Sequence, residues 1–236
     1  MLKVNRICSG YGDTQILEEL SLDAKQGEIT VVLGPNGHGK TTLLRTISGL
    51  LKTTSGEIEF DGTSISNEQP ENIVSMGLTH IPQGDLLFPD MTVEENLLVG
   101  GFTLKNRASR EKKLKAALEM FPQLGQRRSQ RTRTLSGGER RMVALARGYM
   151  SDAKFIMIDE PSLGLAPVLV EEVYGYISTL TGTGVSVLIV EENFSHIKNF
   201  ADMVYLVESG KVVASGPPAQ VAADSAVMAT YLGIQV

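Results

Sequence analysis

The chain alternates between short apolar runs rich in β-branched residues and stretches whose apolar residues recur at helical spacing. Residues 28–33 form one such run before a glycine-rich turn, and residues 41–47 continue with helical spacing. Two further runs, 155–158 and 185–190, flank residues 167–180, which begin with proline and carry apolar residues on one helical face. Strands that alternate with helices predict an α/β fold with a mostly parallel sheet.

Short strands joined by turns are predicted outside this core. Residues 1–26, with a turn at 10–13, and residues 56–62 follow a strand pattern. We therefore expect an antiparallel β layer beside the parallel sheet. Residues 205–213 have the pattern of a hairpin, and a short helix is expected at the end of the chain.

The middle of the chain, from residue 92 to residue 150, has a helical composition. Thr92 and Glu95 are spaced as a capping box at a helix start, and residues 109–120 are rich in Lys, Glu, Ala and Leu. We expect a helical subdomain over about residues 84–150, inserted into a single domain that spans residues 1–236.

The composition is that of an ordinary folded protein, with 236 residues of which 42% are hydrophobic and 21% charged. These values exclude disorder, collagen and coiled coil as the dominant class. No apolar run exceeds five residues, whereas a membrane-spanning helix needs about 20. Any membrane role of the chain is therefore expected to be peripheral.

The N-terminus, the cysteine content and the net charge bear on the location of the chain and on its partners. The first 13 residues contain no continuous apolar segment, so we expect no cleaved leader and a cytoplasmic location. A single cysteine, Cys8, excludes an internal disulfide framework. The net charge of −5 disfavours nonspecific binding to nucleic acid.

A phosphate-binding motif lies between the first predicted core strand and its helix, which is the context that this motif requires. Backbone N–H groups of the glycines approach phosphate oxygens, Lys40 adds positive charge near the β and γ phosphates, and Thr41 is suited to hold Mg²⁺. His38 is interpreted as a spacer that faces solvent. The motif consists of Gly34, Pro35, Asn36, Gly37, His38, Gly39, Lys40 and Thr41, and Thr42 is included in the nucleotide-binding set.

Two acidic residues, Asp159 and Glu160, end the apolar run 155–158. The carboxyl edge of a parallel sheet is where such sheets bind ligands. Asp159 is suited to the magnesium shell, and Glu160 to orienting and deprotonating a water in line with the γ phosphorus.

A second helix start with phosphate-binding character follows Leu135. Ser136 and Glu139 are spaced as a capping box around Gly137 and Gly138, before a stretch with helical spacing. One nucleotide does not need two such helix starts, unless the second faces a nucleotide held by another copy.

Together these motifs resemble the ATP-binding-cassette (ABC) ATPases, whose signature is Leu-Ser-Gly-Gly-Glu upstream of an Asp-Glu strand. The resemblance covers nearly the whole chain and implies the P-loop NTPase core of that family, with ATP and Mg²⁺ as cofactors. It implies that Tyr11 stacks on adenine and that Gln83, in the loop that joins core and helical subdomain, contributes to the metal site and to catalysis. Residues 161–165 resemble the loop that meets its counterpart across a dimer.

More narrowly, residues 91–97, 100–102 and 160–167 resemble the ATP-binding subunits of branched-chain amino acid importers. Urea and amide importers share part of these strings and stay open as alternatives. The resemblance implies a second ATPase subunit, identical or related, and separate membrane permeases that dock near residues 83–96. A substrate-binding protein is implied indirectly, and the location is the cytoplasmic face of the membrane.

Glu192 stands where most ABC ATPases carry a histidine, after the apolar run 185–190. An ionised glutamate accepts hydrogen bonds but donates none to a γ phosphate. Protonation, a bridging water and a weaker contribution are therefore all open for Glu192 in catalysis. His196 is an alternative donor, although we expect an ordinary solvent-facing helix residue there.

Arginines at positions 127, 128, 131, 133, 140 and 141 surround the signature. They allow a nucleic-acid interface, but no aromatic residue interleaves them, so we interpret them as a solvated surface and expect no nucleic-acid partner. A soluble cassette acting on DNA or ribosomes usually has two cassettes or a long insertion. A GTPase is disfavoured because no Asn-Lys-x-Asp string occurs.

Overall fold

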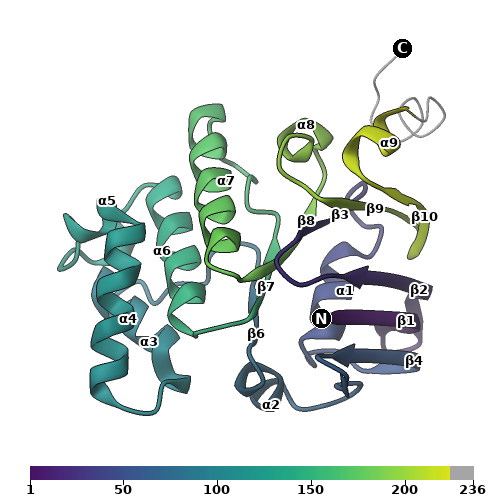
Figure 1. Ribbon diagram of the computed structural model, residues 1–236, viewed down its shortest axis with the longest axis horizontal. Helices are drawn as coiled ribbons and strands as arrows, with labels where there is room; N and C mark the ends of the chain where they lie inside the picture. Colours follow the sequence, from purple (N-terminus) through teal and green to yellow (C-terminus); the bar gives the residue numbers. More distant parts are fainter. Residues whose placement is uncertain (224–236) are drawn as a thin grey trace.

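The structure is a computed structural model that describes residues 1–223. Its centre is a six-stranded sheet in the order β10-β9-β3-β8-β7-β6, in which β10 alone runs antiparallel to its neighbour (Figure 1). The predicted α/β fold with a mostly parallel sheet is confirmed. The strands are β3 (Ile29–Leu33), β6 (Leu78–Ile81), β7 (Phe155–Asp159), β8 (Ser186–Glu191), β9 (Met203–Glu208) and β10 (Lys211–Gly216).

The three central strands, β3, β8 and β7, are buried along their whole length. Both faces of a parallel sheet are covered, so its strands are continuous apolar runs rather than alternating ones. Because these strands are parallel, their carboxyl ends meet at one edge. The phosphate loop follows β3, Glu160 follows β7 and Glu192 follows β8 at that edge.

A second, antiparallel sheet has the order β2-β1-β4-β5 and confirms the predicted antiparallel layer. Its inward apolar side chains share a core with helix α1 (Lys40–Ile47) and with one face of the six-stranded sheet, for example Val32 and Phe155. The strands are β1 (Leu2–Tyr11), β2 (Thr14–Ala24), β4 (Thr53–Phe60) and β5 (Thr63–Ser64).

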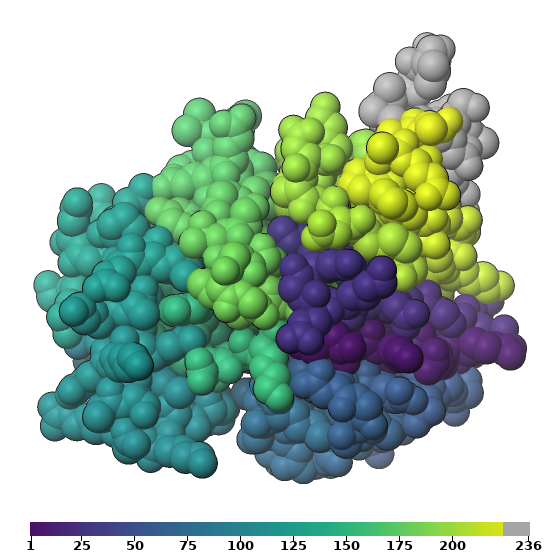
Figure 2. Space-filling model, in the orientation of Figure 1, coloured from purple at the N-terminus to yellow at the C-terminus, as the bar shows by residue number. Residues whose placement is uncertain are grey.

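Most of the remaining helices gather at the other end of the molecule. Figure 1 shows α3 to α6 together, away from the antiparallel sheet, and Figure 2 shows the same residues as a teal lobe with a hollow between it and the blue residues. These elements are α3 (Val93–Gly100), η1 (Gly101–Thr103), α4 (Arg107–Met120), α5 (Pro122–Gly125), η2 (Thr132–Thr134) and α6 (Gly137–Met150). Both predicted capping boxes are present, at Thr92 and at Ser136.

The other helices flank the six-stranded sheet. They are α2 (Pro70–Ser75), α7 (Pro167–Gly182), α8 (Phe194–Ile197) and α9 (Pro218–Ala223). The predicted hairpin is formed by β9 and β10, and α9 supplies part of the predicted final helix, while residues 224–236 lie outside the described part. Across residues 1–223, none of the helices has the length and apolar character needed to span a bilayer.

Candidate nucleotide-binding site

The phosphate loop connects β3 to α1 and leaves the helix start without a side-chain cap. Gly39 occupies the N-cap with φ 99°, a left-handed conformation in which a side chain is strained. The first N–H groups of α1 therefore receive no capping side chain, which is the arrangement that binds phosphate. Thr42 is buried in the first turn of this helix.

Lys40 is buried and faces both the loop and the acidic residues. Its Nζ donates to the carbonyl oxygens of Gly34 at 2.7 Å and Pro35 at 3.0 Å. The same nitrogen lies 3.7 Å from Oε1 of Glu160. The lysine predicted to neutralise phosphates and the predicted base are thus brought together, although they are distant in sequence.

Asp159, the last residue of β7, lies beside the phosphate loop. The hydroxyl Oγ1 of Thr41 donates to its Oδ1 at 3.2 Å. Burial raises the pKa of Asp159, while the hydrogen bond from Thr41 and the charge of Lys40 oppose that shift. A hydroxyl and a carboxylate oxygen therefore lie side by side at the carboxyl edge of the sheet.

Glu160 has φ 46°, a left-handed backbone conformation that is uncommon outside glycine. Its Oε2 accepts a hydrogen bond from Nε2 of Gln83 at 2.8 Å. Burial raises the pKa of Glu160, Lys40 lowers it, and Asp159 raises it further. A carboxylate with a raised pKa, held by two neighbours, is well placed to accept a proton.

His38 faces solvent only in part, although full exposure was predicted. It is half-buried, and its Nδ1 accepts a hydrogen bond from the backbone N–H of Ser209 at 3.0 Å. The carbonyl of His38 also accepts from the N–H of Gly210 at 3.1 Å. The turn between β9 and β10 therefore fixes the middle of the phosphate loop, a contact between residues that are far apart in sequence.

Tyr11 ends β1 at the rim of the site, and its side chain is 43% exposed. Its hydroxyl accepts a hydrogen bond from Arg45 of α1 at 3.1 Å. The hydroxyl is thereby fixed while part of the ring stays accessible to a flat ligand.

The signature residues form a separate, self-contained helix start. The Oγ of Ser136 accepts from the N–H of Glu139 at 3.3 Å, and Glu139 in turn accepts from the N–H of Ser136 at 2.8 Å. Ser136 and Gly137 are exposed, and Gly138 packs against Leu169 of α7. Within residues 1–223, no hydrogen bond or ion pair joins residues 136–139 to the phosphate loop.

Glu192 is exposed directly after β8, and its Oε2 accepts a hydrogen bond from Nδ2 of Asn36 at 2.9 Å. The structure therefore has this glutamate beside the phosphate loop, acting as an acceptor. His196 is only partly exposed on α8, and its Nδ1 lies 3.2 Å from Oγ of Ser162, so the predicted exposure to solvent holds in part.

Four of the six arginines around the signature form ion pairs with carboxylates. Arg127 pairs with Glu139 at 2.6 Å, Arg133 pairs with Asp90 at 3.1 Å, and Arg128 pairs with Glu94. Arg141 is buried and lies 3.1 Å from Asp85, without the alignment of a hydrogen bond. These contacts agree with a surface of paired charges rather than an open basic patch.

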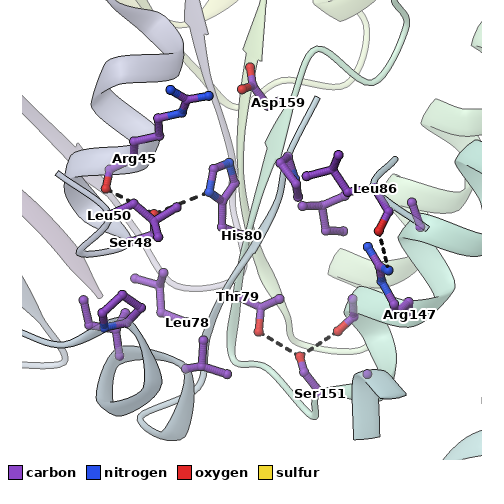
Figure 3. Close-up of a pocket in the computed structure, with 18 of the residues that line it drawn as sticks. Arg45, Ser48, Leu50, Leu78, Thr79, His80, Leu86, Arg147, Ser151 and Asp159 are labelled. Carbon is purple, nitrogen blue, oxygen red and sulfur yellow. Dashed lines mark hydrogen bonds between the residues drawn. The ribbon is translucent and has the colours of Figure 1, made fainter. Parts of the chain in front are cut away.

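A groove of about 900 Å³ runs between the core and the helices α3 and α6. Figure 3 shows Arg45 and His80 on one side of it and Leu86 and Arg147 on the other. Its exposed apolar side chains are Leu50, Leu86, Phe88, Val99 and Phe102. Gln83, Thr41 and Asp159 also line the groove, so the groove extends to the acidic pair.

Several residues around this groove were not found from the sequence. Burial and the nearby Arg45 lower the pKa of His80 to about 4, and its Nδ1 lies 3.4 Å from Oγ of Ser48. Arg147 donates to the carbonyls of Leu86 at 2.8 Å and Asp85 at 2.9 Å. None of these residues belongs to a motif with fixed spacing, so no local pattern indicated them.

Comparison with known families identifies the architecture. Residues 17–163, more than half of the chain, match the family model described as ABC transporter. The chain belongs to this ABC transporter family. It is accordingly an ATPase that binds nucleotide, and the predicted family resemblance is confirmed.

Relatives of this ABC ATPase match along the whole chain. The branched-chain amino acid transport ATP-binding protein BraG of Pseudomonas aeruginosa is 36% identical, covering 99% of this chain and 100% of its own. The lipopolysaccharide export system ATP-binding protein LptB of Haemophilus influenzae is 34% identical, covering 100% and 98%. The crystal structure of the ADP conformation of MJ1267, an ATP-binding cassette of an ABC transporter, has TM-score 0.88 and 29% identity, with 97% of each chain covered.

Proposed function

We propose that this ABC ATPase hydrolyses ATP with Glu160 as the general base. The observation that carries the proposal is the convergence of Lys40 and Gln83 on the two oxygens of the Glu160 carboxylate. In the proposed step, Glu160 takes a proton from water, the water oxygen bonds to the γ phosphorus, and the bond to the ADP oxygen breaks. Lys40 neutralises charge on the phosphates, and Gln83 fixes the orientation of the base.

Thr41 and Asp159 would hold the Mg²⁺ that accompanies the nucleotide. Their side-chain oxygens lie together beside the phosphate loop, and hard oxygen ligands are what Mg²⁺ prefers. Gln83, which borders the same site, is proposed as an additional ligand through its amide oxygen. Bound there, Mg²⁺ would neutralise charge on the β and γ phosphates.

We further propose that two copies, or this chain and a related ATPase subunit, enclose two nucleotides. The phosphate loop of one subunit would face Ser136 and its neighbours in the other. Support comes from the separation of the two helix starts within one chain and from the exposure of Ser136. The apolar residues Leu163, in the loop after β7, and Val168, in the first turn of α7, are 49% and 76% exposed and are candidates for the same contact.

The groove beside Gln83 is the proposed docking site for a membrane permease subunit. It combines exposed apolar side chains with a direct connection, through Gln83, to the base Glu160. Residues of about 84–150 would act as a helical subdomain that moves the permease when nucleotide is bound. This arrangement would place the chain at the cytoplasmic face of the membrane.

The proposed substrate class is branched-chain amino acids, taken up with the help of a substrate-binding protein. Residues 91–97 and 160–167 carry the strings typical of such importers, and the similarity to BraG extends over 99% of the chain. Urea and amide importers remain the second candidate, because they share part of these strings. Uptake of labelled leucine and of labelled urea by the reconstituted transporter distinguishes these two substrate classes.

A pulldown from the membrane fraction tests the docking site. Phe102→Asp places a charge in the groove and should abolish co-purification of hydrophobic permease subunits, with ATP affinity retained. Val213→Asp is the matched control, because Val213 is also exposed but lies on β10, at the opposite edge of the sheet from β6. Equal recovery of permease with Phe102→Asp and with the unaltered protein would exclude the groove, and recovery of nucleic acid instead would exclude the transport function.

A further inference from the structure

A buried carboxylate lies next to the proposed active site, at a position that no mechanism described above uses. Glu191 is the last residue of β8 and is 2% exposed. A buried carboxylate is costly unless hydrogen bonds satisfy both of its oxygens. The groups that satisfy Glu191 therefore indicate what it holds in place.

Three donors from three different segments converge on Glu191. The hydroxyl of Tyr174, on α7, donates to Oε1 at 2.5 Å, and the backbone N–H of Ser162 donates to the same oxygen at 3.2 Å. The backbone N–H of Glu192 donates to Oε2 at 3.1 Å. An ionised carboxylate only accepts hydrogen bonds, so it suits a site in which every partner is a donor.

The segments tied together by Glu191 are those that surround the proposed base. Ser162 follows Glu160 by two residues in the chain. The N–H of Glu160 donates to the carbonyl of Val190 at 3.1 Å, and the carbonyl of Glu191 accepts from Gly34 at 3.2 Å. The end of β8 thus contacts the loop after β7 and the start of the phosphate loop at once.

Tyr174 fixes the carboxylate from the side of α7. Its ring lies 4.4 Å from that of Phe200, centroid to centroid, and the side chain is buried. Burial, and next the negative charge of Glu191, raise the pKa of the Tyr174 hydroxyl. The tyrosine therefore stays a neutral donor at neutral pH.

We propose that Glu191 is a positioning residue for ATP hydrolysis. Through its hydrogen bonds to the N–H groups of Ser162 and Glu192, it holds the loop after β7 and the residue after β8 next to Glu160. Tyr174 locks the Glu191 side chain in this role. The proposal rests on the proposed function of Glu160 as the base. It concerns residues that need not touch the nucleotide.

Tyr174→Phe is the sharpest test, because it removes one donor and keeps the ring. Catalysis is sensitive to misplacement on the ångström scale, so kcat should fall about tenfold while the KM for ATP stays unchanged. Tyr176→Phe is the matched control: this tyrosine lies on the same helix, where its ring stacks on Phe121, and its turnover should match the unaltered protein. Steady-state ATPase assays on the full chain, with circular dichroism to confirm folding, give both parameters.

Glu191→Gln supplies a second readout. The carboxylate accepts hydrogen bonds on both of its oxygens, whereas the amide of nearly the same volume has only one acceptor oxygen. We expect kcat to fall about tenfold while the KM for ATP stays unchanged. A purely structural role would instead lower the free energy of unfolding and leave kcat per folded molecule unchanged.

The outcomes separate this inference from the function on which it rests. Normal kcat in folded Tyr174→Phe, together with an inactive Glu160→Gln, would overturn the positioning role and leave the base assignment intact. Normal turnover in Glu160→Gln would instead overturn the proposed function itself. If neither Tyr174→Phe nor Glu191→Gln folds, the network is structural and the proposal is wrong.

Discussion

The starts of α1 and α6 are the two helix starts predicted to bind phosphate, and they differ in how their first N–H groups are capped. Helix α1 begins at Gly39 without a side-chain cap, so its first N–H groups lie open beside buried Lys40. Helix α6 begins at Ser136 with a complete capping box, in which Ser136 and Glu139 satisfy each other. The first start is prepared for a ligand, whereas the second is satisfied within its own chain.

The residues that surround the two helix starts also differ. The start of α1 is bordered by the ends of β7 and β8, which bring Asp159, Glu160 and Glu192 to it. The start of α6 is bordered mainly by its own capping residues and by Arg127. We infer that the α1 start is a complete binding site for phosphates, and that the α6 start contributes only when another subunit supplies a nucleotide.

Glu160→Gln should cause the largest loss of turnover, and it tests whether hydrolysis takes place at the α1 start. Loss of a positioned general base typically slows turnover by about 10² to 10⁴-fold. Affinity for ATP should persist, because Lys40 and the open N–H groups are unchanged, and ATP-bound dimers should accumulate. Phosphate release and nucleotide titration measure the two quantities, and near-normal turnover would assign the base to another residue.

Ser136→Arg tests whether the α6 start serves a partner's nucleotide. The variant should bind ATP normally as a single subunit but lose ATP-dependent dimerisation, with turnover about 10²-fold lower because the reacting groups are no longer oriented. Size-exclusion chromatography with ATP and assays over a range of protein concentrations test this. Normal activity at every concentration would contradict the contribution in trans.

Mixing two impaired variants sharpens that comparison. In a dimer of Ser136→Arg with Lys40→Ala, one composite site has both of its helix starts intact, while the other has neither. The mixture should therefore recover part of the activity that each variant lacks alone. An inactive mixture in which mixed dimers are demonstrated would show that both sites must be intact together.

Lys40→Ala should weaken ATP binding by about 10 to 100-fold, the usual loss when a charged hydrogen-bonding group is removed. The helix start and its N–H groups remain, so binding should not vanish. Equilibrium titration with ATP measures the effect, and the affinity for adenosine, which lacks phosphates, is the control. Unchanged ATP affinity in the folded variant would contradict the assignment of the phosphate loop.

Glu192→Gln should have the smallest effect, because we expect Glu192 to contribute little direct stabilisation of the γ phosphate. The amide is nearly isosteric and is able to donate, so turnover should rise slightly or the KM for ATP should fall. The charge of Glu192 helps to raise the pKa of Glu160. Removing the charge of Glu192 should therefore move the acid limb of the kcat profile to lower pH. Measurements of kcat for both proteins from pH 6 to 9 test this shift.

The outcome for Glu192 separates three roles. A protonated Glu192 that donates to the phosphate would instead make the rate of the unaltered protein fall as pH rises, with the glutamine variant insensitive. A loss of orders of magnitude at every pH in Glu192→Gln would show that the carboxylate itself is essential. Either result would bring Glu192 into the set of groups that act directly at the α1 start.

Features set by neighbouring residues could be predicted from the sequence. The phosphate loop, the acidic end of β7 and both capping boxes depend on spacings of a few residues, so their patterns are visible in the chain. The strand β6 and the short helix α2 were not predicted. At four residues, with a partly exposed Thr79 and His80, β6 lacks the continuous apolar run that identified β3 and β7.

Contacts made by packing between distant elements could not be predicted. His38 contacts Ser209 only because the turn between β9 and β10 lies over the phosphate loop. His196 contacts Ser162 only because α8 packs next to the loop after β7. Glu191 directly follows the apolar run 185–190 and was visible in the sequence, but its donor Tyr174 is provided by a helix that lies elsewhere in the chain.

The order of strands in the central sheet also determines when the protein first becomes able to bind nucleotide during synthesis. The phosphate loop follows β3, yet β3 pairs with β8 and β9, which are made more than 150 residues later. Parallel pairing across such a separation forms slowly, because a long loop must close first. A nascent chain therefore carries a translated phosphate loop for most of its synthesis without a sheet to hold it, and ATP should stabilise only chains in which β8 and β9 have emerged from the ribosome.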